Sequence, residues 1–257
     1  MNQRLVRLAA ATVMAIATVS AQAKDWKVVR VAVEGVYPPF NYMDKGQLVG
    51  FDVDIAKALC SKMQVQCQFT TQEWDGMIPG LMSGKYDAII SSMAITDERK
   101  QKVDFSDKYY ATPARFIAAK DTDIKDVSPK ALEGKTIGVQ GSTTQATYLQ
   151  DQYKNSTIKT YKSVDDANMD LAAGRIDLVM SDSVLLYEFL SKTKDGSCCK
   201  FVGPEIRNEK YFGPGKGIAV RKDSDDLRDK FNVAIKQILS DGTYKTINAK
   251  YFPFSVY

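Results

Sequence analysis

Two segments of the chain share one residue pattern, and this internal repeat restricts the fold more than any other feature of the sequence. Residues 84–92 and 174–182 both contain a glycine, a basic residue, one variable residue, an aspartate, three apolar residues, a serine and a final polar residue. Each segment follows apolar residues at helical spacing, so each glycine is expected to end a helix that leads into a buried strand. The chain therefore contains two similar halves.

A short apolar strand is also predicted near the start of each half, at residues 29–35 and 136–141. Strands that alternate with helices in this way indicate an α/β fold with two lobes and mainly parallel sheets. Ligands of such sheets bind beyond the carboxyl ends of the strands. The predicted ends are all polar and comprise Glu34 and residues 91–92, 140–143 and 181–182. Two facing lobes would bring these ends together around one cleft.

The chain has no histidine among its 257 residues. This excludes the Ser-His-Asp triad, the Cys-His pair, the HExxH zinc site and imidazole acid–base catalysis. A content of 44% hydrophobic and 26% charged residues is typical of a globular protein. The cysteines lack zinc-site spacing, and we expect neither a metal nor another cofactor.

Residues 1–23 have the features of a cleaved secretory signal peptide. Arg4 and Arg7 precede an apolar run over residues 8–19, and residues 21–23 form a small-x-small cleavage site. The run of about 12 residues is shorter than the roughly 20 that span a bilayer. We therefore expect export to the periplasm and a soluble mature chain with 35 − 2 = 33 basic and 31 acidic residues. A net charge of 33 − 31 = +2 is too small to predict nucleic acid or an anionic membrane as the partner.

Two of the four cysteines are predicted to form a disulfide in this oxidising compartment. Cys60 lies near the end of a predicted helix and Cys67 near the start of a predicted strand, so a bridge would join the two elements. Two buried free thiols are the alternative. Cys198 and Cys199 are adjacent, a spacing that does not easily meet ordinary disulfide geometry, and both a free pair and a strained vicinal bridge are open.

Residues at the predicted strand ends are suited to binding a zwitterion. Arg99 can offer a bidentate cation to a carboxylate, and Ser92 and the turn at residues 141–143 can add hydroxyl and amide donors. Asp182 can pair with an ammonium group. Each residue has a structural alternative: Arg99 as a solvated surface arginine among charged residues 97–100, and Asp182 as the N-cap of the following helix.

A further group of residues suits a cationic side chain. Glu34 supplies a second carboxylate, and the aromatic residues Tyr37 and Trp74 can stack on a cation, which contributes about 0.5–2 kcal/mol per face. The structural alternatives are a turn position for Glu34 and core or rim positions for the two aromatic residues. Their joint placement at matching strand ends supports the binding interpretation.

Many short motifs occur in a characteristic order, at residues 34–40 (EGVYPPF), 50–54, 74–81, 86–93, 96–99, 103–106, 109–110, 138–143, 174–177 and 250–252. With these motifs the chain resembles the amino-acid-binding periplasmic proteins of ABC importers, bacterial extracellular solute-binding protein family 3. The nearest likeness is to the lysine/arginine/ornithine, arginine/ornithine and histidine binders, and it covers nearly all of residues 24–257. The resemblance implies a type II periplasmic binding protein fold, with a two-strand hinge and a ligand cleft between the lobes.

The resemblance implies a role for each site residue. Arg99, with Ser92 and Thr143, would hold the α-carboxylate of the ligand, and Asp182 would hold its α-ammonium. The ligand-binding set also includes Met93, Ala94, Val139 and Ser142. The resemblance also pairs Cys60 with Cys67, in agreement with the argument from the predicted elements.

The distal part of the ligand would meet a second group of residues. By the same resemblance Glu34 would face the side-chain cation, Tyr37 and Trp74 would enclose the aliphatic stem, and Ser91 would contact the distal group. Three positions of the predicted site depart from the family pattern. Ala94 stands where the lysine and histidine binders carry a serine, Glu34 is one methylene longer than their aspartate, and Trp74 is larger than its counterpart.

We therefore predict a periplasmic binding protein for a cationic L-amino acid, with arginine or ornithine before lysine or histidine, that delivers its ligand to an inner-membrane ABC permease. A binder of opines such as octopine or nopaline is one alternative, and an enzyme on the same fold, such as a cyclohexadienyl dehydratase, is another. The predicted lobes are residues 24–112 with 208–257, and residues 113–207. We expect a monomer.

Overall fold

A twisted sheet forms the centre of the first lobe. Among the residues that the structure, a computed structural model, describes (25–257), this sheet has the strand order β5-β1-β6-β13-β7. Its strands are β1 (Val28–Val33), β5 (Gln66–Thr71), β6 (Ala88–Ile89), β7 (Asp104–Tyr110) and β13 (Lys216–Val220). β1 runs parallel to β5 and β6, while β13 runs antiparallel to β6 and β7. The predicted signal peptide, residues 1–23, lies outside the described residues.

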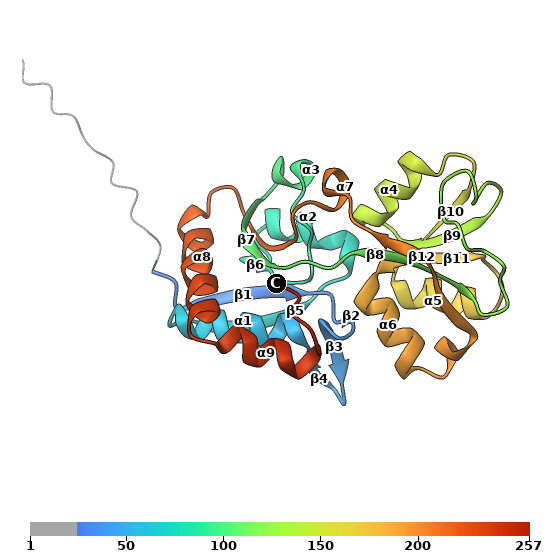
Figure 1. Cartoon of the computed structure of the whole chain (residues 1–257). Helices are drawn as coiled ribbons and strands as arrows, with labels where there is room; N and C mark the ends of the chain where they lie inside the picture. The colour runs from blue at the N-terminus through green and yellow to red at the C-terminus, as the bar shows by residue number, and fades with distance from the viewer. Residues whose placement is uncertain (1–24) are drawn as a thin grey trace, which may run out of the picture.

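The second lobe has a matching sheet with the strand order β10-β9-β11-β8-β12. Its strands are β8 (Ala114–Ala119), β9 (Thr136–Gln140), β10 (Thr157–Tyr161), β11 (Leu178–Asp182) and β12 (Cys199–Ile206). β9 is parallel to β10 and β11, and β8 is antiparallel to β11 and β12. A small sheet of β2 (Val36–Tyr37), β3 (Asn41–Asp44) and β4 (Gln47–Val49) extends from the first lobe. The predicted two-lobed α/β fold is confirmed (Figure 1).

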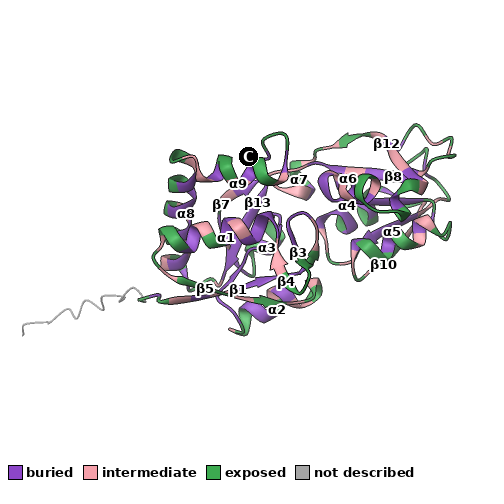
Figure 2. Cartoon of the chain, turned by 90° about the horizontal axis from the view of Figure 1, so that it is seen from below, coloured by how far each residue is buried: buried purple, intermediate pink, exposed green. Residues whose placement is uncertain are grey.

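Helices connect the strands in the same order in both halves. The first half contains α1 (Phe51–Lys62) and α2 (Met77–Met82), and the second contains α4 (Thr144–Gln152) and α5 (Val164–Ala172). The remaining helices are α3 (Asp97–Lys100), α6 (Ser183–Lys192), α7 (Glu209–Phe212), α8 (Asp225–Ser240), α9 (Thr243–Tyr251) and the 3-10 turns η1 (Trp74–Gly76) and η2 (Asp195–Cys198). Their outward faces are exposed, while central strands such as β9, β11 and β13 are largely buried (Figure 2). None of the helices within residues 25–257 is long and apolar enough to cross a membrane.

The repeated pattern has the same structural role in each half. Gly84 and Gly174 follow the ends of α2 and α5 with φ angles of 74° and 69°, a left-handed conformation that glycine adopts without strain. The aspartate three residues later accepts a hydrogen bond from the first strand of its own half. Asp87 accepts from the Arg30 amide at 3.0 Å, and Asp177 accepts from the Thr136 amide at 2.8 Å. The repeat therefore ends a helix and then fixes the register of a central strand.

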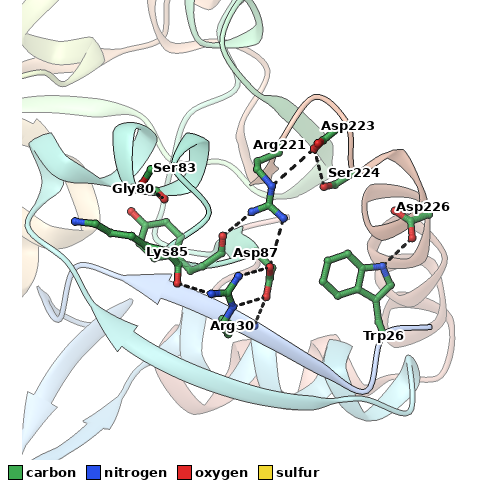
Figure 3. Close-up of polar contacts among 11 residues, drawn as sticks. Trp26, Arg30, Gly80, Ser83, Lys85, Asp87, Arg221, Asp223, Ser224 and Asp226 are labelled. Carbon is green, nitrogen blue, oxygen red and sulfur yellow. Dashed lines mark hydrogen bonds and ion pairs between the residues drawn. The ribbon is translucent and has the colours of Figure 1, made fainter. Parts of the chain in front are cut away.

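In the first lobe the repeated aspartate also carries an ion-pair network (Figure 3). The Asp87 carboxylate lies 2.8 Å from Nη2 of Arg30 and 3.4 Å from Nη2 of Arg221, whose Nη1 donates to the Tyr86 carbonyl at 2.7 Å. Burial alone would raise the pKa of Asp87, but the hydrogen bonds from Arg30 outweigh it and the pKa is lowered. The network joins β1, the start of β6 and the end of β13. It lies away from the strand ends that face the other lobe.

The chain passes between the lobes twice, once from β7 to β8 and once from β12 through α7 to β13 (Figure 1). Beside the first connection, the amide of Ser183 donates to the Pro113 carbonyl at 2.9 Å. On the second, Tyr211 of α7 packs edge-on against Tyr148 of α4, with ring centroids 5.2 Å apart. These two connections are the hinge of the type II fold.

Both cysteine pairs are disulfides. Cys60 at the end of α1 is bonded to Cys67 in β5, as predicted, with Cα atoms 5.9 Å apart. Cys198 and Cys199 are bonded to each other, so of the two alternatives that the sequence leaves open the structure contains the vicinal bridge.

Removing the Cys60–Cys67 bridge should lower the free energy of unfolding by about 2.5 kcal/mol, because the bridge closes a short loop in the unfolded chain. For a protein of this size that corresponds to a decrease in Tm of roughly 5–10 °C. Thermal denaturation of the Cys60→Ser/Cys67→Ser double variant measures it. A double variant as stable as the wild type would show that the bridge contributes nothing to stability.

Candidate functional site

A small cavity lies between the two lobes, where their strands end. Eight of the residues predicted to bind ligand line it: Glu34, Tyr37, Trp74, Ser91, Ser92, Ala94, Arg99 and Thr143. They come from the ends of β1 and β6, from β2, from η1 and α3, and from the turn that follows β9. Three of the four polar strand ends expected to meet at the cleft, Glu34 and residues 91–92 and 140–143, therefore contribute to the cavity, whereas residues 181–182 do not line it.

The other four predicted residues lie outside this cavity. Met93 and Ser142 line an adjoining, more open hollow, and Val139 is buried in the apolar core of the second lobe. Asp182 ends β11 and is 1% exposed. Its carboxylate caps α6 by accepting from the Val184 amide at 3.0 Å, and it accepts a further hydrogen bond from the Thr112 hydroxyl. The N-cap alternative for Asp182 is thus a feature of the structure.

Arg99 is directed into the protein. Thr96 caps α3 by accepting from the Arg99 amide, and Arg99 as a whole is only 9% exposed, so the interpretation of Arg99 as a solvated surface residue is wrong. Its Nη1 donates to the Ala94 carbonyl at 3.0 Å, and its Nη2 donates across the cleft to the Ser142 carbonyl at 3.4 Å. The indole of Trp74 lies 5.3 Å from the guanidinium and donates to the same carbonyl at 3.0 Å. Burial lowers the pKa of Arg99 to about 10, so it remains charged at neutral pH.

Glu34 also reaches across the cleft. Its Oε1 accepts from Nε2 of Gln140 at 2.5 Å, and Gln140 donates in addition to the Lys162 carbonyl at 3.0 Å. The pKa of Glu34 is raised to about 7, mainly by burial. The Gln140 hydrogen bond acts in the opposite direction, and the negative charges of Asp165 and Asp75 add to the rise. Glu34 is therefore a carboxylate that a cation in the cavity would stabilise in its ionised form.

A buried aspartate supports the first lobe's side of the cavity. Asp52, the second residue of α1, accepts from the hydroxyls of Ser92 and Tyr109, each at 2.8 Å, and from the Asn41 amide group at 2.7 Å. Burial raises its pKa to about 6 against the effect of these hydrogen bonds. Ser92 itself has a φ of 56°, an uncommon left-handed conformation held by these contacts. The sequence analysis did not identify Asp52 as part of the site.

On the second lobe, the start of α4 faces the cavity. Thr143 caps this helix by accepting from the Ala146 amide at 3.1 Å, and Thr144 and Gln145 line the cavity beside it. The first amides of a helix carry partial positive charge and lack partners within the helix. This end of α4 is therefore suited to an anionic group.

Four cavity residues, Gln140, Thr144, Gln145 and Lys216, were not among the predicted site residues. Gln140 was predicted at a strand end but not as a ligand-binding residue, and Thr144 and Gln145 directly follow the predicted turn, so the expectation that ligands bind beyond the ends of parallel strands could have included all three. Lys216 lies far along the chain at the start of β13. A lysine between two glycines immediately before a buried strand is its only sequence signal.

Two lobes that are joined by two connections and enclose a polar cavity define a binding protein of the clamshell type. The chain belongs to the bacterial extracellular solute-binding proteins, family 3, which match residues 29–254. This confirms the resemblance identified from the motifs.

Relatives and solved structures of this family extend over most of the chain. An L-arginine-binding protein of Pseudomonas aeruginosa is 49% identical over 235 residues, which cover 90% of both chains. The lysine/arginine/ornithine-binding periplasmic protein of Escherichia coli K12 is 40% identical over 234 residues, again 90% of both. A solved structure of an ancestral arginine-binding protein bound to arginine has a TM-score of 0.81 at 37% identity and covers 88% of this chain and 98% of that one.

Proposed function

We propose that the protein is the periplasmic substrate-binding component of an ABC importer, and that it binds a cationic L-amino acid, arginine or ornithine before lysine or histidine. The observation that carries the proposal is the composition of the interlobe cavity. A buried guanidinium, Arg99, and a buried carboxylate, Glu34, line it together with the aromatic residues Tyr37 and Trp74. These groups match the anionic and cationic ends of such a ligand and its aliphatic stem. The names of the relatives support the same ligand class.

The ligand's backbone groups have candidate partners on both lobes. Arg99 and the start of α4 would bind the α-carboxylate, with Ser92 and Thr143 beside it. Asp182 would bind the α-ammonium; its carboxylate accepts hydrogen bonds from Thr112 and the Val184 amide and retains lone pairs for one from the ligand. Burial raises the pKa of Asp182, and an ammonium contact would favour the ionised form.

Binding requires movement of the residues that fill the cavity. Its volume is about 20 Å³, which is room for about one water molecule. Gln140 occupies the position at Glu34 that a ligand cation would take. We infer that the lobes open, the Glu34–Gln140 contact breaks, and the lobes close again with the ligand's cationic group against Glu34.

The remaining parts of the proposal concern the organisation of the chain. We assign residues 24–112 with 208–257 to the first lobe and residues 113–207 to the second. Residues 1–23 direct export and are removed. The mature protein acts as a monomer, because docking to an inner-membrane permease and closure of the lobes both need free surface, and it releases its ligand unchanged.

A thermal-shift panel tests the ligand class. At a concentration about a thousandfold above Kd, a ligand stabilises the folded protein by about 4 kcal/mol, a Tm increase of roughly 8–16 °C for a chain of this size. We expect such shifts with arginine and ornithine and smaller ones with lysine and histidine. The panel also contains glutamine, glutamate, octopine and nopaline.

Several results would contradict the proposal. A larger shift with glutamine or glutamate than with any cationic amino acid would reject the role of Glu34. A larger shift with octopine or nopaline would identify an opine binder. Formation of a phenyl product from prephenate or arogenate would identify an enzyme.

A further inference from the structure

Lys216 is the charged residue of the cavity lining that the proposed ligand contacts do not use. Its position is fixed by the backbone, because β13 begins at this residue and pairs with the loop that carries Ala94. Ala94 and Lys216 form an antiparallel bridge, flanked by hydrogen bonds from the Ile95 amide to the Gly215 carbonyl at 2.9 Å and from the Gly217 amide to the Met93 carbonyl at 3.0 Å. Lys216 is therefore held beside the loop that leads to Arg99.

The glycines on either side make this close approach possible. A Cβ on Gly217 would lie 2.8 Å from the Ile95 side chain, and one on Gly215 would lie 2.7 Å from the Tyr110 carbonyl oxygen. Gly215 also has a φ of 154°, which other residues rarely adopt. The GKG sequence at residues 215–217 thus brings a lysine to a position that a bulkier neighbour would prevent.

Lys216 is a buried residue whose ammonium has no direct partner among the described residues. The residue is 7% exposed and lines the cavity. Within residues 25–257 it donates no hydrogen bond, and no carboxylate lies within the 4.0 Å of an ion pair. Burial lowers its pKa; the more distant carboxylates of Asp182 and Asp52 raise it and Arg99 lowers it. A buried cation without a contacting anion is unfavourable, so an anionic group of a ligand would find an unsatisfied partner here.

Two cations therefore flank Ala94. The guanidinium of Arg99 donates to the Ala94 carbonyl at 3.0 Å, and the backbone of Lys216 forms the antiparallel bridge with Ala94. A carboxylate between the two would contact both and would relieve their mutual repulsion. We propose that Lys216 is a specificity-determining residue that binds the ligand's α-carboxylate together with Arg99. This inference rests on the proposed function, because it assumes that the cavity binds an α-amino acid.

The test compares arginine with argininamide, in which a neutral amide replaces the carboxylate. Lys216→Met has a chain of similar length without charge. It should weaken arginine binding by about 30-fold or more, the usual loss when one partner of a buried charge pair is removed. It should weaken argininamide binding less than about threefold, because the amide offers no charge to Lys216. Isothermal titration of both ligands against wild type and variant gives the two ratios.

Two further variants make the comparison decisive. Lys236→Met removes an exposed lysine on α8 and should leave both affinities unchanged. Lys216→Gln removes the charge but keeps a polar side chain, and it should repeat the selective loss if Lys216→Met fails to fold. Unliganded melting curves establish that each variant is folded.

The outcomes separate the inference from the proposed function. Equal losses of affinity for arginine and argininamide would overturn the inference and would indicate that Lys216 only neutralises Asp182 and Asp52. An unchanged affinity for arginine in Lys216→Met would overturn it as well. In both cases the wild type still binds arginine and the proposed function stands. A wild type that binds no α-amino acid would reject both. If it binds only a neutral α-amino acid, the proposed ligand class fails, and the same comparison with that acid and its amide decides the role of Lys216.

Discussion

Replacing Arg99 by methionine should weaken arginine binding by at least about 100-fold, equivalent to about 2.7 kcal/mol. The guanidinium is buried and charged at neutral pH, and it can offer a planar fork to a carboxylate. Its removal leaves the ligand carboxylate in a closed cavity where Lys216 is the remaining basic residue among the described residues of the lining. It also removes the contacts to Ala94 and to Ser142 across the cleft.

Comparison with argininamide distinguishes the ligand contact from the contact between the lobes. If Arg99 binds the carboxylate, Arg99→Met loses much more affinity for arginine than for argininamide, and Arg99→Lys recovers part of the arginine affinity because it restores a charge without the fork. Arg175→Met is the matched control, since Arg175 is exposed, pairs with Asp170 and lies in neither connection between the lobes. Equal losses for the two ligands would mean that Arg99 acts by holding the lobes together.

The fold follows from local patterns that the sequence carries openly. The glycines at 84 and 174 and the apolar runs after them predicted the helix ends and central strands, because a left-handed helix end and a buried strand each depend on few neighbouring residues. The contacts of Asp87 and Asp177 with the first strand of each half were not predicted. They depend on which strands become neighbours, and the residue pattern alone does not fix that order.

The site was predictable where it depends on strand ends and less so where it depends on packing between distant segments. Glu34, Ser92 and Thr143 lie at the ends of predicted strands and line the cavity as expected. Whether they contact a ligand stays a prediction. Lys216 reaches the cavity only because the chain returns to the first lobe and β13 pairs with the loop at Ala94. Asp52 is buried by groups from three separate segments, an arrangement that periodicity does not encode.

Glu34→Gln should remove the preference for a cationic side chain. Arginine and citrulline have the same shape, but citrulline is neutral at the distal end. In the wild type the Glu34 carboxylate would pair with the guanidinium in a buried setting, so we expect arginine to bind at least about 30-fold more tightly than citrulline. In Glu34→Gln the arginine affinity should fall by a similar factor while the citrulline affinity changes little. Glu133→Gln, an exposed glutamate far along the chain in the second lobe, is the control.

The dependence on pH has a definite sign. The pKa of Glu34 is about 7 without a cation beside it, and a guanidinium contact lowers it, so binding favours the ionised carboxylate and releases a proton below pH 7. Arginine affinity should therefore rise with pH up to about 7 and level off above it, with up to a tenfold loss per unit below. Glu34→Gln should abolish most of this slope, and any remainder belongs to Asp182 or Asp52, whose pKa values are also raised. Isothermal titration of the wild type from pH 5 to pH 8 measures this dependence. An arginine affinity that does not change over this range would mean that no cation binds at Glu34. A buried carboxylate with this pKa must lose its proton before it can pair with a cation.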